Sequence, residues 1–299
     1  MNNDNLSNNL DNEIDLAELF AIIWDKKIFI SVFTSIAALL SVLYSLSLPN
    51  IYTSSTLLAP TTEDSSLSSQ LGSFSGLAGL AGVSLPTGTV SNSQIAIKRI
   101  ESFEFFSKYF LPNIKLENLM AVDEWNAADN SLIYDDEEFD SNANKWDKKP
   151  SNQKAYKEYK EVLSISQEEL TGLVYLSINH KSPVVAKHWV DTIIYNINEC
   201  MREIDKQDAQ NSIDFLNESL KNTNSQSIKV VFAKLMESQM QTLMLASSND
   251  AYVFKTINSP IVPEDKSAPG RAVICILGTL LGGILSILIV LFRNFRQIS

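Results

Sequence analysis

The clearest pattern in this chain is the position of two long uncharged apolar segments, one near each end. One runs from Ile28 to Leu48 and the other from Ala272 to Phe292, and each is 21 residues long. A helix rises about 1.5 Å per residue, so either segment spans roughly 31 Å, which matches a hydrocarbon core of about 30 Å. A helix of a soluble domain is seldom apolar on every face over that length. The pattern predicts two transmembrane helices, residues 28–48 and 272–292.

A cleaved signal peptide is the alternative interpretation of the first apolar segment. A signal peptide has a short basic leader and a small-residue cleavage site, whereas this segment follows 27 residues that carry six acids and ends in Leu-Ser-Leu-Pro. The leader also contains a short amphipathic segment, residues 14–27, with apolar residues at helical spacing. We therefore expect the first apolar segment to remain as an anchor.

Basic residues next to the two apolar segments predict the orientation of the chain. Two lysines precede the first segment and two arginines follow the second: Lys26, Lys27, Arg293 and Arg296. Basic residues close to a span favour the cytoplasmic side. We expect residues 1–27 and 293–299 in the cytoplasm and residues 49–271 as one domain on the far side. Arg271 and Lys266 oppose this assignment, but long segments cross a membrane regardless of their charge.

The segment between the spans has a mixed pattern that predicts an α+β domain. Strands are predicted at residues 51–58, 163–166, 173–179 and 252–257, and helices at residues 91–111, 156–162, 184–220 and 228–247. Thr171 and Gly172 predict a turn, Ser182 a helix cap with Pro183 after it, and residues 112–150 are expected to be irregular. The domain then consists of a base, residues 49–183 and 248–271, and a long helical hairpin, residues 184–247.

Both hairpin helices carry apolar residues at helical spacing, which predicts contacts with partner helices. The candidates for an oligomer interface are Ile213, Leu216, Leu220, Phe232 and Leu235.

Composition argues against several classes of function. The net charge of −11 disfavours nucleic-acid binding, which needs a basic face. The two cysteines, Cys200 and Cys275, are expected to be free thiols, and His180 and His188 to be structural. The sequence has no Cys-x2-Cys pair, and these are its only cysteines and histidines, so a zinc site is not expected. We identify no candidate catalytic, cofactor-binding or metal-ligating residues, and therefore expect no cofactor and no enzymatic activity.

Two further segments suggest chemistry but lack the residues for it. The acidic run 135–140 has no turn glycine for a calcium loop and is expected to be a solvated loop. The glycine-rich segment 72–88 lacks the Gly-Lys of a phosphate-binding loop. It is either a mobile loop or a small-residue surface that packs between subunits or near the membrane.

The approach to the second span is rich in proline, and the span itself contains spaced glycines. Pro260, Pro263 and Pro269 favour an extended, stiff connection into the membrane. Gly278 and Gly282 are four residues apart, a spacing that lets another helix approach closely, either the first span or a neighbouring subunit. The alternative is that both are ordinary glycines of a membrane helix.

These features together resemble the Wzz-type chain-length determinants, the polysaccharide co-polymerases of Gram-negative bacteria. The resemblance is carried by EIDLAELFAIIWDKKIFI before the first span, by LSISQEELTGLVYLSINHKSPVVAKHWVD and the helix after it, and by the proline-then-glycine pattern at the second span. It implies a ring-shaped homo-oligomer in the inner membrane with a periplasmic domain. It also implies a regulator that sets O-antigen or lipopolysaccharide chain length together with a separate membrane-embedded polymerase and a lipid-linked glycan.

Other functions stay open from the sequence. The alternative is a membrane adaptor for capsule or exopolysaccharide export that activates a separate cytoplasmic tyrosine kinase. Because only seven residues follow the second apolar segment, an autonomous kinase domain is not expected. A sensor and an enzyme of the outer compartment are less favoured, because no output module and no catalytic constellation are recognised.

Overall fold

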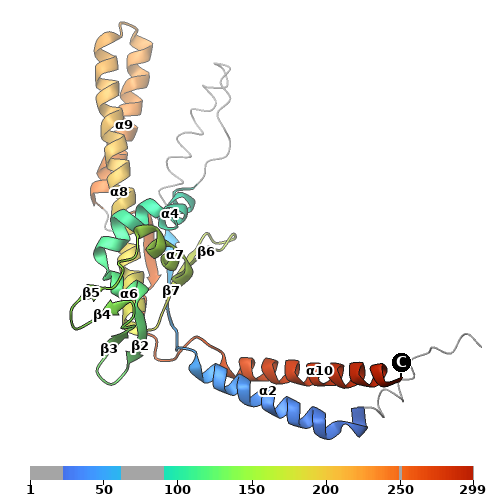
Figure 1. Cartoon of the computed structure of the whole chain (residues 1–299). Coiled ribbons are helices and arrows are strands. Elements are labelled where there is room, and N and C mark those ends of the chain that lie inside the picture. Colours follow the sequence, from blue (N-terminus) through green and yellow to red (C-terminus); the bar gives the residue numbers. More distant parts are fainter. Residues whose placement is uncertain (1–22, 62–90, 249–250, 299) are drawn as a thin grey trace, which may run out of the picture. The chain divides into compact units, whose positions relative to one another are not determined.

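The computed structural model describes residues 23–61, 91–248 and 251–298 (Figure 1). Most of the predicted amphipathic segment, residues 14–22, and the glycine-rich segment 72–88 lie outside the described residues. The chain divides into two compact units, residues 51–266 and residues 1–50 with 267–299. The second unit contains two long helices, α2 (Lys27–Ser47) and α10 (Arg271–Ile298).

The unit 51–266 combines strands and helices. Its strands are β1 (Tyr52–Pro60), β2 (Val122–Asn126), β3 (Ser131–Tyr134), β4 (Phe139–Asp140), β5 (Lys145–Trp146), β6 (Leu163–Gln167), β7 (Val174–His180) and β8 (Phe254–Asn258). Its α-helices are α4 (Asn92–Ile100), α5 (Phe103–Phe105), α6 (Leu116–Met120), α7 (Asn152–Val162), α8 (Pro183–Asn222) and α9 (Gln226–Ser248). A π-helical turn, Phe106–Phe110, and a 3₁₀ turn, Leu111–Asn113, follow α5.

A four-stranded antiparallel sheet in the order β6-β7-β1-β8 is the centre of this unit. Along β7, every second side chain is buried, including Val174, Leu176 and Ile178, and α8 packs against β7 and β1. The opposite faces of β1 and β7 carry mostly hydroxyl and amide side chains. This alternation is typical of an antiparallel sheet with one face on the core and one face in solvent.

The core beneath the sheet is rich in aromatic rings. Phe110 lies 4.7 Å from Tyr159 and 5.6 Å from Trp189, measured between ring centroids. All three side chains are fully buried, and the Tyr159 hydroxyl donates to the carbonyl of Ile100 at 3.0 Å. These contacts join α7, α8 and the π-helical turn, because large buried rings contribute much of the apolar area of a small core.

One buried amide ties α8 to the last strand. The Asn198 Oδ1 accepts hydrogen bonds from the backbone N–H groups of Val253 (2.8 Å) and Phe254 (2.9 Å), and its Nδ2 donates to the carbonyl of Phe254 at 3.1 Å. Buried backbone groups need such partners, since an unsatisfied one costs about 1–3 kcal/mol. Asn198 therefore fixes where β8 begins relative to α8.

Much of the predicted secondary structure is confirmed. The chain is mixed helix and sheet, with apolar helices near both ends and a long hairpin formed by α8 and α9. Ser182 caps α8 by accepting from the Val185 N–H, and Pro183 is the first helical residue. Gly172 has φ +70°, a conformation that glycine adopts without strain, and it turns β6 into β7 as predicted.

The single helix predicted at residues 91–111 is wrong. Helix α4 ends at Ile100, and Ser102 starts a new helical segment, because its hydroxyl accepts from the Phe105 N–H and donates to the Arg99 carbonyl. The Ser102 hydroxyl caps a second helix, and no proline or glycine marks this break in the sequence. The regular spacing of apolar residues therefore suggested one continuous helix.

The irregular loop predicted at residues 112–150 is also wrong. It contains α6 and two short hairpins, β2-β3 and β4-β5. Asn130 and Asn144 adopt left-handed backbone angles, which asparagine tolerates better than most residues, and so permit tight turns. Phe139 and Trp146, on paired strands, lie 5.0 Å apart. The segment is so rich in polar residues that the pairing of Phe139 with Trp146 was not predicted from the sequence.

Candidate functional site

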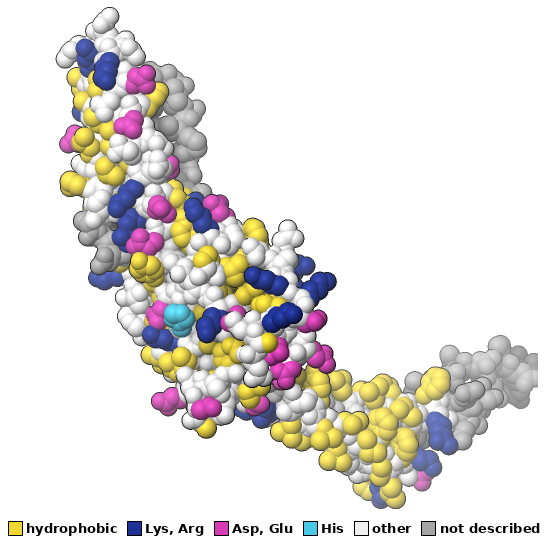
Figure 2. Space-filling view, turned by 60° about the vertical axis from the view of Figure 1, so that its left-hand side comes forward, with side chains coloured by type: hydrophobic (Ala, Val, Ile, Leu, Met, Phe, Trp, Pro, Cys, Tyr) yellow, Lys and Arg dark blue, Asp and Glu magenta, His cyan; other side chains and the backbone are white. Residues whose placement is uncertain are grey.

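The helix pair α2 and α10 has its apolar side chains on the outside. Leu39 and Leu43 of α2 and Leu281 and Leu288 of α10 are more than half exposed, and hydrophobic side chains cover the face of this pair that Figure 2 shows. Both helices are long and apolar enough to cross a membrane. A core helix of a soluble protein would instead bury its leucines, so the exposed pattern favours a lipid environment.

Small residues form the contact between α2 and α10. A Cβ atom added at Gly278 would lie 2.4 Å from the Ser41 Cβ, and one added at Gly282 would lie 2.3 Å from the Ala37 Cβ. Ser286 of α10 and Ser45 of α2 are also buried. The two predicted glycines thus face the first span of the same chain, and the close approach depends on the missing Cβ atoms.

The partner residues on α2 were not identified from the sequence, although a signal was present. Ala37, Ser41 and Ser45 are four residues apart and therefore lie on one helix face. This spacing of small residues matches that of Gly278 and Gly282 and could have predicted the pairing.

Arg271 connects the two helix ends. Its Nη2 donates to the Asn50 Oδ1 at 3.2 Å and reaches the Leu48 carbonyl at 3.5 Å. The last carbonyls of α2 have no helical partners, and a cation is favourable at a helix C-terminus. An arginine that appeared only to oppose the charge rule for orientation therefore has a local structural role.

The three predicted junction prolines differ in their surroundings. Pro260 is buried, whereas Pro263 and Pro269 are half-buried. Pro260 and Pro263 follow β8, and the carbonyl of Ile261, between them, accepts a hydrogen bond from the Ser54 hydroxyl at 2.8 Å. Pro269 precedes α10 and its carbonyl accepts from the Arg271 N–H at 2.9 Å. The three prolines lie outside the helices and strands of the described residues, and a stiff, extended connection stays a prediction.

The hairpin interface candidates fall into two groups. Ile213 and Leu216 are 6% and 7% exposed within the single chain, on a stripe of α8 that also contains buried Ala209. Helix α8 packs along α9, so this stripe belongs to the interior of the hairpin. Leu220 and Phe232 are half-buried, and Leu235 is 39% exposed.

Other apolar side chains of the hairpin are more exposed than the predicted candidates. Phe215 of α8 is 68% exposed, and Met240 and Met244 of α9 are 52% and 69% exposed. Helix α9 has only three charged residues among its 23: Lys229, Lys234 and Glu237. A helix this poor in charge usually covers its apolar surface with a partner.

The buried titratable side chains of the base, His180 and Cys200, have surroundings that suit a structural role. The His180 Nδ1 accepts from the Ser182 N–H at 2.9 Å, and its Nε2 lies 2.8 Å from the Asn118 carbonyl, to which it donates as a neutral ring. Burial lowers the pKa of His180, which keeps the ring neutral. Burial likewise raises the pKa of the Cys200 thiol, so this cysteine is a poor nucleophile. Within the described residues, no three acidic, histidine or cysteine side chains group in a way that could hold a metal ion.

A family model matches part of this chain. Residues 12–110 match the family model Wzz, described as chain length determinant protein. A search of curated proteins gives no match. A full-length bacterial polysaccharide co-polymerase is 14% identical, with 95% of this chain and 98% of that chain covered and a TM-score of 0.41.

A second solved structure is a fragment of WzzB, the polysaccharide co-polymerase from Salmonella Typhimurium. It is 13% identical, with 73% of this chain and 100% of that chain covered and a TM-score of 0.28. Both TM-scores lie below 0.5. The family model, in contrast, spans the first apolar helix, β1 and α4. It confirms, over residues 12–110, the similarity to Wzz-type chain-length determinants that the sequence predicts.

Proposed function

We propose that this protein is a non-catalytic regulator of O-antigen or lipopolysaccharide chain length. It acts as an oligomeric inner-membrane co-polymerase together with a separate, membrane-embedded polymerase. The observation that carries the proposal is the match of residues 12–110 to the chain-length-determinant family.

The proposed topology has both termini in the cytoplasm and residues 49–271 in the periplasm. The apolar surface of α2 and α10 supports a membrane location for both helices. The two lysines at the start of α2, Lys26 and Lys27, and the arginines near the end of α10 support the orientation. In this arrangement the base and hairpin meet the growing, lipid-linked glycan on the periplasmic side.

The proposed assembly is a ring of identical subunits that contact one another through their hairpins. The exposed side chains Phe215, Leu235, Met240 and Met244 support this assignment better than Ile213 and Leu216, which are buried within one subunit. Covering exposed apolar area contributes roughly 25 cal/mol for each Å² removed from water.

Deletion of the gene tests the proposal. We expect the lipopolysaccharide ladder on a gel to lose its preferred chain length, and a plasmid-borne wild-type copy to restore it. A plasmid-borne copy with a stop codon in α8 is the matched control. An unchanged ladder would contradict the proposal. If capsule export and phosphorylation of a separate tyrosine kinase fell instead, the adaptor function would replace it.

A further inference from the structure

The sheet has one edge that lacks the usual protection against pairing with another strand. Strand β6 is the outer strand next to β7, and its sequence, Leu-Ser-Ile-Ser-Gln, contains no charge and no proline. It pairs with β7 over all five residues without a bulge. Natural proteins commonly block such edges with lysine, proline or a bulge, because open edges recruit further strands.

The opposite edge of the same sheet shows the contrast. Strand β8 has an irregular register against β1 at Leu57 and Leu58, and it carries an exposed lysine, Lys255. The chain after β8 also bonds back to β1, since the Ser54 and Thr56 hydroxyls donate to the carbonyls of Ile261 and Asn258. One edge is therefore protected and the other is open.

The register shows which backbone groups of β6 point outward. The Glu168 N–H donates to the Leu173 carbonyl at 2.8 Å, so Glu168 and Leu173 form a hydrogen-bonded pair. Such pairs alternate along an antiparallel ladder, so the N–H and C=O groups of Ser166 face β7 and those of Ile165 and Gln167 face away. Among the described residues, these outward backbone groups have no hydrogen-bond partner.

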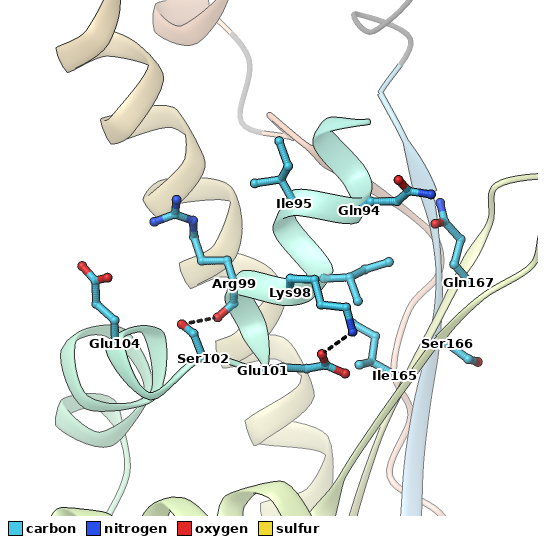
Figure 3. Close-up of a pocket in the computed structure, with 11 residues that line it drawn as sticks. Gln94, Ile95, Lys98, Arg99, Glu101, Ser102, Glu104, Ile165, Ser166 and Gln167 are labelled. Atoms are coloured by element: carbon cyan, nitrogen blue, oxygen red, sulfur yellow. Dashed lines mark hydrogen bonds and ion pairs between the residues drawn. The ribbon is translucent and has the colours of Figure 1, made fainter. Parts of the chain in front are cut away.

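A groove of about 760 Å³ lies beside this open edge, between β6 and helix α4 (Figure 3). Its apolar lining consists of Ile165 from β6 and Ile95 and Ile97 from α4. At one end, the Gln167 Nε2 bonds the Ser93 hydroxyl at 3.3 Å and so joins strand and helix. A strand edge beside a helix, with an apolar lining between them, is the arrangement used when an extended peptide adds to a sheet.

The charge and chemistry of the groove favour one kind of occupant. Its charged lining residues cancel: Lys98 and Arg99 against Glu101 and Glu104. Lys98 bonds Glu101 at 2.9 Å, and Figure 3 shows Arg99 directed away from Lys98. A neutral groove complements an uncharged segment. Among the residues that the structure describes, no aromatic side chain lines the groove on which a sugar ring could stack, whereas unused main-chain groups complement another main chain.

We propose that β6 and α4 form a docking site for an uncharged, extended segment of a partner polypeptide. The segment pairs antiparallel with β6 and exchanges two hydrogen bonds each with Ile165 and Gln167. Its aliphatic side chain opposite Ile165 lies on the same face and enters the groove, since directly opposed residues share a face of the sheet.

A fluorescein-labelled pentapeptide, Ser-Val-Thr-Val-Ser, tests this site on the full chain in detergent by fluorescence anisotropy. Valine opposite Ile165 turns its own N–H toward β6. We expect N-methylation of the two valine amides to weaken binding at least about tenfold, because the bonds to β6 are lost. N-methylation of the threonine amide, which points away, should leave affinity within about twofold.

Variants of the chain provide the second half of the test. Ile165→Pro removes both an outward N–H and an aliphatic lining side chain and should weaken binding at least about tenfold. Ile165→Val keeps the N–H and a branched aliphatic side chain and should not weaken binding. Ile95→Ser, at a partly exposed lining position, should weaken binding several-fold and serves if the proline variant fails to fold. Equal binding of both N-methylated peptides, or displacement of the peptide by maltoheptaose, would overturn the proposal. No binding of the unmodified peptide would overturn it as well.

Discussion

At the scale of single residues, Asp205 of α8 is held in a surrounding that disfavours its charge. Burial raises the pKa of its carboxyl group above the usual 3.8, although the Tyr252 hydroxyl donates to its Oδ2 at 2.6 Å. Asp208, one turn further along α8, raises the pKa in the same direction, and Arg99 opposes it. The ionised carboxylate therefore lowers the stability of the folded state at neutral pH.

Asp205→Asn should accordingly stabilise the base at pH 7, because the amide oxygen can still accept the Tyr252 hydroxyl without a charge. The gain should shrink as the pH falls through the folded-state pKa of Asp205, where the wild-type carboxyl becomes neutral, and be smallest near pH 3.8. Urea unfolding of both proteins across this pH range provides the measurement. Asp214→Asn, on the exposed side of α8, is the control for the loss of one negative charge from this helix. A stability gain of Asp205→Asn that stays constant with pH would contradict a raised pKa of Asp205 in the folded state.

At the scale of elements, the contact between α2 and α10 depends on one glycine more than on its neighbour. A Cβ at Gly282 would meet the Ala37 Cβ at 2.3 Å, whereas a Cβ at Gly283 would lie 3.8 Å from the Thr34 Oγ1, an ordinary contact. Gly282→Ala should force the helices apart and cost about 1–3 kcal/mol, as overpacking typically does. Gly283→Ala should be tolerated.

Thermal unfolding in detergent, followed by circular dichroism, compares these two alanine variants. Both add one methyl group to the same turn of α10, so hydrophobicity and helix propensity change equally. Equal melting temperatures would show that the close approach at Gly282 is not needed for the helix pair.

The elements also show how far sequence reasoning extends. Long uncharged apolar segments predicted α2 and α10, long periodic patterns predicted α8 and α9, and a serine cap with proline located the start of α8. Break points set by one side chain were missed, as at Ser102, where a hydroxyl restarts the helix. Contacts between distant segments, such as that of Asn198 with Phe254, were also missed. The burial of Ile213 and Leu216 was missed as well. Each of these depends on which face of a helix meets its neighbour, and the sequence pattern does not give that.

At the scale of the whole molecule, the proposed ring requires that assembly and subunit folding depend on different side chains of the hairpin. Ile213 is buried in the contact stripe of α8, and its replacement by serine removes an apolar side chain and buries a hydroxyl. Such changes in a core typically cost about 2–5 kcal/mol. Phe215 and Met244 are exposed on the single chain, so replacing them removes no contact that the subunit itself needs.

The double variant Phe215→Ser with Met244→Ser should therefore retain the unfolding free energy of the wild type to within about 1 kcal/mol, since exposed positions are usually tolerant. Its oligomers in detergent should be smaller or shorter-lived by native mass spectrometry, because these two side chains supply apolar area that only a neighbouring subunit can cover. Ile213→Ser should show the opposite result. Its unfolding free energy should fall, and its oligomers should be lost only under conditions in which the subunit itself unfolds. If the double variant kept the full native mass at every protein concentration, the ring contacts would have to lie on another face of the subunit.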